Sequence, residues 1–116
     1  MNSKMNKTIN EKVIMGIDPG TNIMGFGIIK ILNNNMQLIE LNELNISKEK
    51  DHYIKLSIIF KRTSELIKQY APDEIAIEAP FFGKNVQSML KLGRAQGVAM
   101  AAGLNFKIPI IEYLQK

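Results

Sequence analysis

Two carboxylates, Asp18 and Glu78, are the side chains of this sequence best placed to do chemistry. Each follows a short apolar run, Val13 to Ile17 before Asp18 and Ile75 to Ile77 before Glu78, of the kind that forms buried strands. A carboxylate at the end of a buried strand is costly unless a cation, a bound metal or a capping hydrogen bond compensates its charge. If the two strands are parallel neighbours, both side chains lie at the carboxyl edge of the sheet, where open α/β sheets bind their ligands.

This pair of carboxylates predicts a site for a hard divalent cation. Two carboxylates held close together repel each other, and a divalent cation between them relieves the repulsion. The sequence has no Cys and a single His, so the donors favour Mg²⁺ or Mn²⁺ over Zn²⁺. A structural interpretation stays open, because Asp18-Pro19-Gly20 is also an ordinary turn sequence and Glu78 could be a half-exposed strand end.

The remaining acidic residues and the single histidine are weaker candidates for chemistry. Asp73 and Glu74 fall at the wrong end of the strand that carries Glu78. Glu112, near the end of the last expected strand, is predicted to lie close to the site, either supporting it or forming a salt bridge. His52 lies at the polar start of a helix, and we expect it to be solvated rather than catalytic.

The elements that must position these residues follow the order β-β-β-α-β-α-β. Three strand-like segments with short connections predict an antiparallel meander, with a bulge near Asn42 or Glu43 where the apolar alternation slips. Two segments of helical period then each lead into a strand, and such crossovers join parallel strands. The sequence therefore predicts an α/β fold, a mixed sheet with helices packed against it. The expected strands cover residues 13–18, 23–31, 36–46, 74–79 and 108–113, and the expected helices cover 51–70 and 85–105.

The second expected helix, residues 85–105, is unusually rich in glycine and alanine. Glycine is unfavourable in the interior of a helix, so its presence there predicts that another element approaches the helix very closely. Three polar residues, Gln87, Lys91 and Arg94, also follow this helix at i, i+4 and i+7 spacing and form a stripe on one of its faces.

Length and composition limit the domain organisation and the classes of function. The 116 residues are enough for one domain, which we expect over residues 13–116, after a disordered basic tail at residues 1–12. That tail lacks the apolar segment of a secretory signal, and no apolar run is long enough to span a membrane. The absence of Cys fits a reducing compartment, and we expect a cytoplasmic protein. The net charge of +4 permits nucleic-acid binding without demonstrating it.

Four separated blocks of the sequence resemble the RuvC family of bacterial Holliday-junction resolvases. The blocks are Ile17-Asp18-Pro19-Gly20-Thr21, Gly25-Phe26-Gly27, Ala76-Ile77-Glu78-Ala79-Pro80-Phe81-Phe82-Gly83-Lys84-Asn85 and Leu92-Gly93-Arg94-Ala95-Gln96-Gly97. The resemblance implies a ribonuclease-H-like fold, in agreement with the element order. It also implies a homodimeric, Mg²⁺-dependent endonuclease that nicks four-way DNA junctions. In such an enzyme Mn²⁺ can replace Mg²⁺, and metal ions activate the attacking water.

The resemblance assigns roles to individual residues of this chain. Asp18 and Glu78 match the first two catalytic metal ligands of the family. Phe81 matches an aromatic residue near the junction centre, where stacking on an unpaired base would be favourable. The resemblance further implies DNA contacts for Lys84, Asn85, Lys91 and Arg94, in which the basic side chains bind phosphates. The small-residue face of the second helix would form the homodimer contact, and a branch-migration motor would be a further partner.

The sequence departs from the family at its end. In the family, two more carboxylates come from a C-terminal helix, and this sequence stops at Lys116 before that helix. We therefore expect the 13–116 domain to be truncated, to bind metal weakly and to cleave junctions poorly by itself. A non-catalytic junction-binding remnant is an open alternative. Two others are an actin-like or sugar-kinase ATPase domain, which shares the Asp-x-Gly-Thr turn but needs a far longer chain, and an RNA-processing relative of the resolvases.

Overall fold

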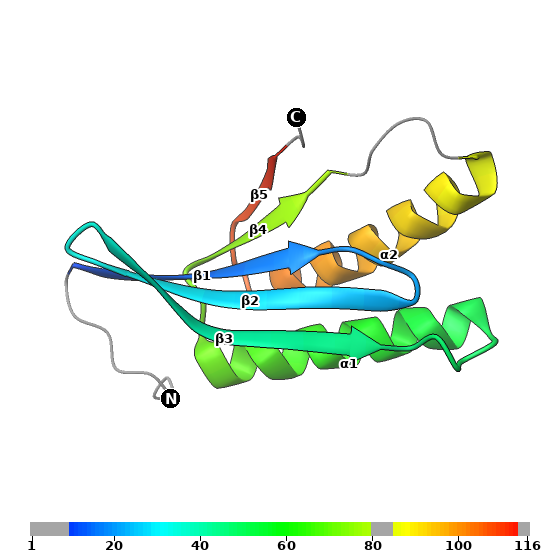
Figure 1. Ribbon diagram of the computed structural model, residues 1–116, viewed down its shortest axis with the longest axis horizontal. Coiled ribbons are helices and arrows are strands. Elements are labelled where there is room, and N and C mark those ends of the chain that lie inside the picture. The colour runs from blue at the N-terminus through cyan, green and yellow to red at the C-terminus, as the bar shows by residue number, and fades with distance from the viewer. Residues whose placement is uncertain (1–9, 80–84, 114–116) are drawn as a thin grey trace.

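The computed structural model describes residues 10–79 and 85–113. Its elements follow the order predicted from the sequence (Figure 1). They are β1 (Glu11–Asp18), β2 (Ile23–Leu32), β3 (Asn35–Asn45), α1 (His52–Tyr70), β4 (Glu74–Glu78), α2 (Val86–Asn105) and β5 (Ile110–Tyr113). Strand β1 begins two residues before Val13, because Glu11 and Lys12 pair with Leu32 and Ile31 of β2.

The five strands form one mixed sheet in the order β3-β2-β1-β4-β5. The first three strands are antiparallel neighbours, β4 is parallel to β1, and β5 is parallel to β4. Both helices lie behind the sheet in Figure 1, so the face turned toward the viewer is open. The α/β mixed sheet expected from the sequence is confirmed, with both crossover helices on the same face.

The alternation of residues along β1 separates the two faces of the sheet. Val13, Met15 and Ile17 are buried on the helix side, where burying each such side chain contributes about 1.5–3 kcal/mol. Because successive strand residues point to opposite faces, Gly16 and Asp18 lie on the open face. The core therefore fixes the face on which the carboxylate lies.

The β2–β3 hairpin carries the bulge that the sequence predicts, at a different position. Ile28 pairs with Glu40 and Ile29 pairs with Leu38, so Ile39 is the extra residue. The predicted position near Asn42 or Glu43 is wrong. The sequence argument took every apolar residue as a mark of the core face, whereas Leu41, paired with Gly27, lies on the open face. The apolar pattern therefore does not slip before Leu44. Leu41 lies on the open face and Leu44 on the helix face, so the strand alternates regularly there.

Local capping sets the ends of α1. The Asp51 carboxylate accepts hydrogen bonds from the backbone N–H groups of Tyr53 (2.9 Å) and Ile54 (3.2 Å), which makes Asp51 the N-cap. The helix ends at Ala71, which precedes Pro72 and has a φ of 46°, in the left-handed region. Its buried face, Ile59, Thr63, Leu66 and Ile67, packs on the sheet core.

Helix α2 uses its small residues to approach the sheet closely, as predicted. Ala95, Ala99 and Ala102 are fully buried. A Cβ added to Gly103 would lie 2.6 Å from Cδ1 of Ile75 and 2.9 Å from Cδ1 of Ile110. A side chain at this position would therefore force the ends of Ile75 and Ile110 to move.

Candidate functional site

The register of the central strands brings the two predicted carboxylates together. Ile17 of β1 is the partner of Ile77 of β4 in a parallel pair, so the next residues, Asp18 and Glu78, are neighbours. Both follow a buried isoleucine and therefore lie on the open face. Adjacent strands are about 4.8 Å apart, so the two carboxylates share one edge of the sheet within reach of a single cation.

A tight turn after β1 holds Asp18 at this edge. Pro19 and Gly20 leave the strand at once, and β2 begins at Ile23. The turn is so close that a Cβ at Gly20 would collide with the carbonyl oxygen of Ile23. Glycine is therefore required at this position for a steric reason, which makes the Asp-Pro-Gly motif both a structural turn and the support of a candidate ligand.

Asp18 and Glu78 belong to a row of residues that crosses the whole sheet. On one side Asp18 pairs with Gly25, which pairs with Glu43. On the other side Glu78 pairs with Tyr113. Gly25 has no side chain, so the surface between Asp18 and Glu43 is hollow. The hollow has a volume of about 610 Å³, and Asp18, Glu43, Tyr113, Gly25 and Leu41 are among the residues that line it.

Sequence reasoning missed Glu43, Tyr113 and Gly25 as parts of this surface. Glu43 lies on β3, two strands away from Asp18 in the sheet, and Tyr113 lies on β5. Only the strand pairing shows that these residues share a row with Asp18. The one available signal was the Gly25-Phe26-Gly27 block, because a glycine inside a strand often marks a place where a ligand approaches closely.

No cationic side chain of the described residues compensates the carboxylate pair. Neither Asp18 nor Glu78 takes part in an ion pair within residues 10–79 and 85–113. Their oxygens fit Mg²⁺, which is commonly bound by one or two carboxylates together with substrate phosphates. In the same ranges no three His, Cys, Asp or Glu side chains converge into a complete metal cage. The pair therefore offers part of a metal site, and its role as ligand stays a prediction.

Glu112 lies beside Glu78 but on the opposite face of the sheet. It pairs with Ile77, one residue before Glu78, and so points to the helix side. There Nε2 of Gln96 donates to Oε2 of Glu112 (3.1 Å) and to the backbone carbonyl of Glu78 (3.2 Å). Glu112 thus supports the end of β4 through Gln96, and it forms no salt bridge with another described residue. The signal for Gln96 in the sequence was a single amide within an otherwise small, apolar helix face.

The predicted DNA-binding residues divide into two groups. Phe81 and Lys84 lie outside the described residues. Asn85 is the N-cap of α2, and its Oδ1 accepts the backbone N–H of Ser88 (2.8 Å). Lys91 and Arg94 are exposed on α2, as the polar stripe predicts. The DNA contacts of all five remain predictions.

His52 is less solvated than the sequence suggested. Its Nε2 is buried and has no hydrogen-bond partner among the described residues. Burial lowers the pKa of the imidazole below its ordinary value of 6.5, and the nearby charges of Arg94, Lys91 and Lys55 lower that pKa further, while Asp51 opposes them. Three basic side chains, Arg94, Lys91 and Lys55, therefore lie near the imidazole at this end of the helix layer.

Comparison with known proteins shows the family and agrees with the fold. The model of the family "Crossover junction endodeoxyribonuclease RuvC" matches residues 14–116. The chain is 71% identical over 107 residues to a crossover junction endodeoxyribonuclease RuvC of Christiangramia forsetii, covering 92% of this chain and 56% of that protein. It is 57% identical over 116 residues to the protein of the same name from Cytophaga hutchinsonii, covering 100% of this chain and 58% of that protein.

Two solved structures share the architecture. Thermus thermophilus RuvC in complex with a Holliday junction substrate superposes with a TM-score of 0.80 at 23% identity, covering 89% of this chain and 64% of that one. The yeast mitochondrial Holliday junction resolvase Ydc2 superposes with a TM-score of 0.68 at 12% identity, covering 89% and 50%. The chain spans little more than half the length of the curated relatives it matches. No helix in the described ranges is both long and apolar enough to cross a membrane.

Proposed function

Because the chain belongs to the RuvC family of crossover junction endodeoxyribonucleases, we propose that it forms the core of a metal-dependent nuclease that resolves four-way DNA junctions. The observation that carries the proposal is the β1–β4 register, which makes Asp18 and Glu78 neighbours on the open face. The family match argues for this function over the actin-like ATPase alternative. By the same argument we propose that the protein acts in DNA recombination and repair.

Enzymes of this family depend on a divalent metal, and we propose that Asp18 and Glu78 hold it in this chain. Their hard oxygen donors favour Mg²⁺, with Mn²⁺ as a substitute. When bound, such a metal polarises the phosphodiester and lowers the pKa of a water molecule that can attack it. The two carboxylates would hold the ion on the open face, where a DNA backbone can approach.

The surroundings of the pair shape that approach. Gly25 leaves a hollow beside Asp18 that can accept a sugar-phosphate segment. Tyr113, about half exposed, lines the same hollow and can pack against a sugar or base. Glu43, the partner of Gly25 on β3, carries a negative charge that repels DNA phosphates. It therefore disfavours a path of the DNA backbone across β3. The DNA strand therefore follows the edge that carries Asp18 and Glu78.

The partners of the domain follow from its exposed residues. Lys91 and Arg94 are free to bind phosphates of the junction, and Phe81 and Lys84 would act beside the metal as the family resemblance implies. We further propose a homodimer through α2, whose outer face exposes Leu90, Leu104 and two glycines with open space around them. A branch-migration motor would be a third partner.

The proposal is tested by neutralising the two carboxylates one at a time in the full-length protein. Asp18→Asn and Glu78→Gln should each lower the rate of Mg²⁺-dependent junction cleavage by about 100-fold or more, since each removes a charge that stabilises the transition state. Junction affinity, measured in Ca²⁺ by gel shift, should stay close to wild type. Glu74→Gln is the matched control, because Glu74 lies at the far end of the same strand. Near-normal cleavage by either carboxylate variant would contradict the assignment.

A non-catalytic junction binder is the second candidate function. The observation in its favour is that only two metal-ligating side chains converge at the edge within the described residues. It predicts junction binding with no metal-dependent turnover in any length of the protein. The cleavage assay on the full-length wild-type protein separates the two, because paired nicks appear only if the nuclease proposal is right.

A further inference from the structure

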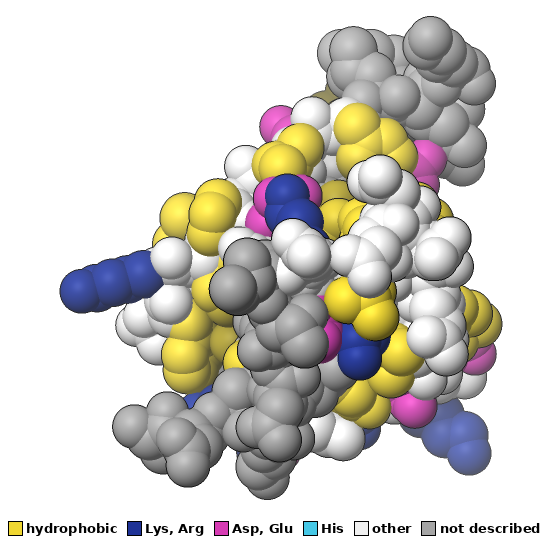
Figure 2. Space-filling view, turned by 90° about the vertical axis from the view of Figure 1, so that its left-hand side faces the viewer, with side chains coloured by type: hydrophobic (Ala, Val, Ile, Leu, Met, Phe, Trp, Pro, Cys, Tyr) yellow, Lys and Arg dark blue, Asp and Glu magenta, His cyan; other side chains and the backbone are white. Residues whose placement is uncertain are grey.

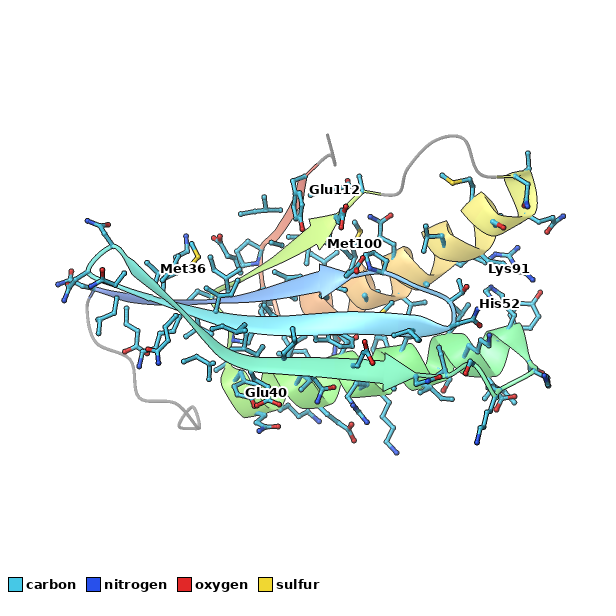
Figure 3. All side chains as sticks on the ribbon, in the orientation of Figure 1. Met36, Glu40, His52, Lys91, Met100 and Glu112 are labelled. Carbon is cyan, nitrogen blue, oxygen red and sulfur yellow. The ribbon has the colours of Figure 1, made fainter. Side chains whose placement is uncertain are left out.

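A second concave site lies at the same end of the sheet as the carboxylates, but in the helix layer. Its walls are the turn after β1, the start of α1 and the start of α2. The cavity has a volume of about 260 Å³ and is lined mainly by Thr21, Lys50, His52, Lys55, Ser88 and Lys91. We name it the His52 pocket. Figure 3 shows the labelled His52 and Lys91 at this end, facing each other from α1 and α2.

The His52 pocket concentrates positive charge without a counter-charge. No Asp or Glu is among the residues that line it. None of its three lysines forms an ion pair with another described residue. Two acids flank Lys50 in the sequence, and both carboxylates accept backbone N–H groups, Glu49 from Asp51 and Asp51 from Tyr53 and Ile54. An anion in the pocket would therefore meet attraction from three ammonium groups with no opposing carboxylate on the wall.

The pocket is also rich in hydrogen-bond donors and poor in acceptors that are free. Lys55 Nζ donates to the carbonyl oxygen of Thr21 and to Oδ1 of Asn22 (both 3.0 Å), which leaves one of its three N–H groups. The buried Nε2 of His52 has no hydrogen-bond partner in the described part of the chain. Buried polar atoms are rarely left without a partner in proteins, so this nitrogen points to a missing ligand. A phosphate group offers the negative charge and acceptor oxygens that these donors lack.

We propose that the His52 pocket binds a phosphate group of the DNA strand that passes the Asp18–Glu78 edge. This assignment rests on the proposed function for its ligand, although the pocket itself is defined by the structure alone. Thr21 follows Asp18 by three residues, so their Cα atoms are at most about 10 Å apart. A single strand can therefore occupy the pocket with one phosphate while a nearby phosphate lies at the carboxylates. The pocket would fix the register of the strand relative to the scissile bond.

The imidazole of His52 provides a direct test, because it is the only histidine of the chain. Its NMR signals are followed while inorganic phosphate, and separately a short single-stranded DNA, are added without divalent metal. NaCl at equal ionic strength is the control for screening. Both phosphate ligands should shift the signals saturably and raise the imidazole pKa, because an oxyanion stabilises the protonated ring. Equal shifts with NaCl would overturn the proposal. A response to inorganic phosphate but not to DNA would overturn the assignment of DNA as the ligand.

Charge-neutral variants separate the pocket from general attraction by a basic surface. Lys50→Gln and Lys91→Gln should each weaken DNA binding and reduce the slope of log K against log salt concentration by about 0.7, the value for one lost contact to a single strand. Lys61→Gln is the matched control, an exposed lysine of α1 outside the pocket. Equal losses for all three variants would overturn the proposal. These measurements use no metal, so they stand whether or not the protein proves to cleave junctions.

Discussion

Single glycines give the candidate site its shape. Gly20 permits the turn that places Asp18 at the sheet edge, and Gly25 leaves the hollow beside it. The two glycines act for different reasons. A Cβ at Gly25 would make only an ordinary contact, 3.6 Å from Cβ of Asp18, whereas a Cβ at Gly20 has no room. Gly20 is therefore needed for folding, and Gly25 for access.

Gly20→Ala should destabilise the domain, because the added methyl group collides with the carbonyl oxygen of Ile23 and strains the turn. We expect a loss of about 1–3 kcal/mol in the free energy of unfolding, measured by urea denaturation. Gly16→Ala, within β1, is the control. Its added Cβ would lie 3.8 Å from the carbonyl oxygen of Gly27, which is an ordinary contact. It should change stability by less than about 0.5 kcal/mol. Equal effects of the two substitutions would contradict the steric argument.

His52 should make stability depend on pH. Burial and the neighbouring cations lower its pKa in the folded protein below 6.5, so the unfolded chain takes up a proton first as the pH falls. The free energy of unfolding should therefore decrease as the pH is lowered from 7.5 through about 6.5 toward the depressed pKa of the folded state. In His52→Gln this decrease should be smaller over the same interval. Identical pH profiles of the two proteins, measured by thermal or urea unfolding, would argue against a perturbed histidine.

At the scale of elements, α2 combines two different uses of small residues. Gly103 and the buried alanines face the sheet and permit close packing, whereas Gly93 and Gly97 have no other atoms near the place a Cβ would take. Gln96, on the same helix, joins the ends of β4 and β5 by donating hydrogen bonds to the backbone carbonyl of Glu78 and to the carboxylate of Glu112. The helix therefore holds the carboxylate edge in place from behind.

Gly103→Ala should test the close packing of α2 on the sheet. The new Cβ would lie within 3 Å of the ends of Ile75 and Ile110, so both side chains must move. Overpacking of this kind costs about 1–3 kcal/mol, offset in part by the better helix propensity of alanine. Gly93→Ala is the control in the same helix. With no atom within 4 Å of its Cβ, it should stabilise the protein by about 0.5–1 kcal/mol. Opposite signs in urea denaturation are the expected result.

At the scale of the whole molecule, the single helix layer leaves one face of the sheet without cover among the described residues. Met36 (72% exposed), Leu38 (58%) and Leu41 (75%) lie on that face of β3. Figure 2, which looks onto the hairpin end, shows hydrophobic side chains at the surface between charged ones. Contiguous apolar surface of this kind marks contact regions in proteins. The molecule thus presents apolar residues both on the open face and on the outer side of α2.

The proposed dimer predicts that a large charged side chain on the outer side of α2 dissociates the protein. Gly97→Arg should raise the dimer dissociation constant at least tenfold, which corresponds to about 1.4 kcal/mol, as measured by sedimentation equilibrium. The fold should be unaffected, because the space around Gly97 is open. Gln69→Arg, an exposed position of α1, is the control and should leave the dimer intact. A monomeric wild-type protein, or equal dissociation by both variants, would contradict the use of α2.

The sequence by itself determined the order of the elements, their approximate ends and the two carboxylates at strand ends. These features depend on local patterns: apolar alternation, helical period and the turn residues Pro19-Gly20. The position of the bulge could not be read in the same way, because the sequence does not say that the open face of β3 also carries leucine. The turn at Asp18 proved to be structural as well as suited to a ligand.

Only the tertiary structure decided which residues share a surface. Glu43, Gly25, Asp18, Glu78 and Tyr113 form one row because four strand pairings align them. Two of these pairings, β1 with β4 and β4 with β5, join segments that are distant along the chain. The same pairings turn Glu112 to the other face, and the packing of the two helices brings His52 beside Lys91. Local patterns fix what a residue can do. Long-range packing fixes its neighbours, because burial of the core sets the register and the face of every strand.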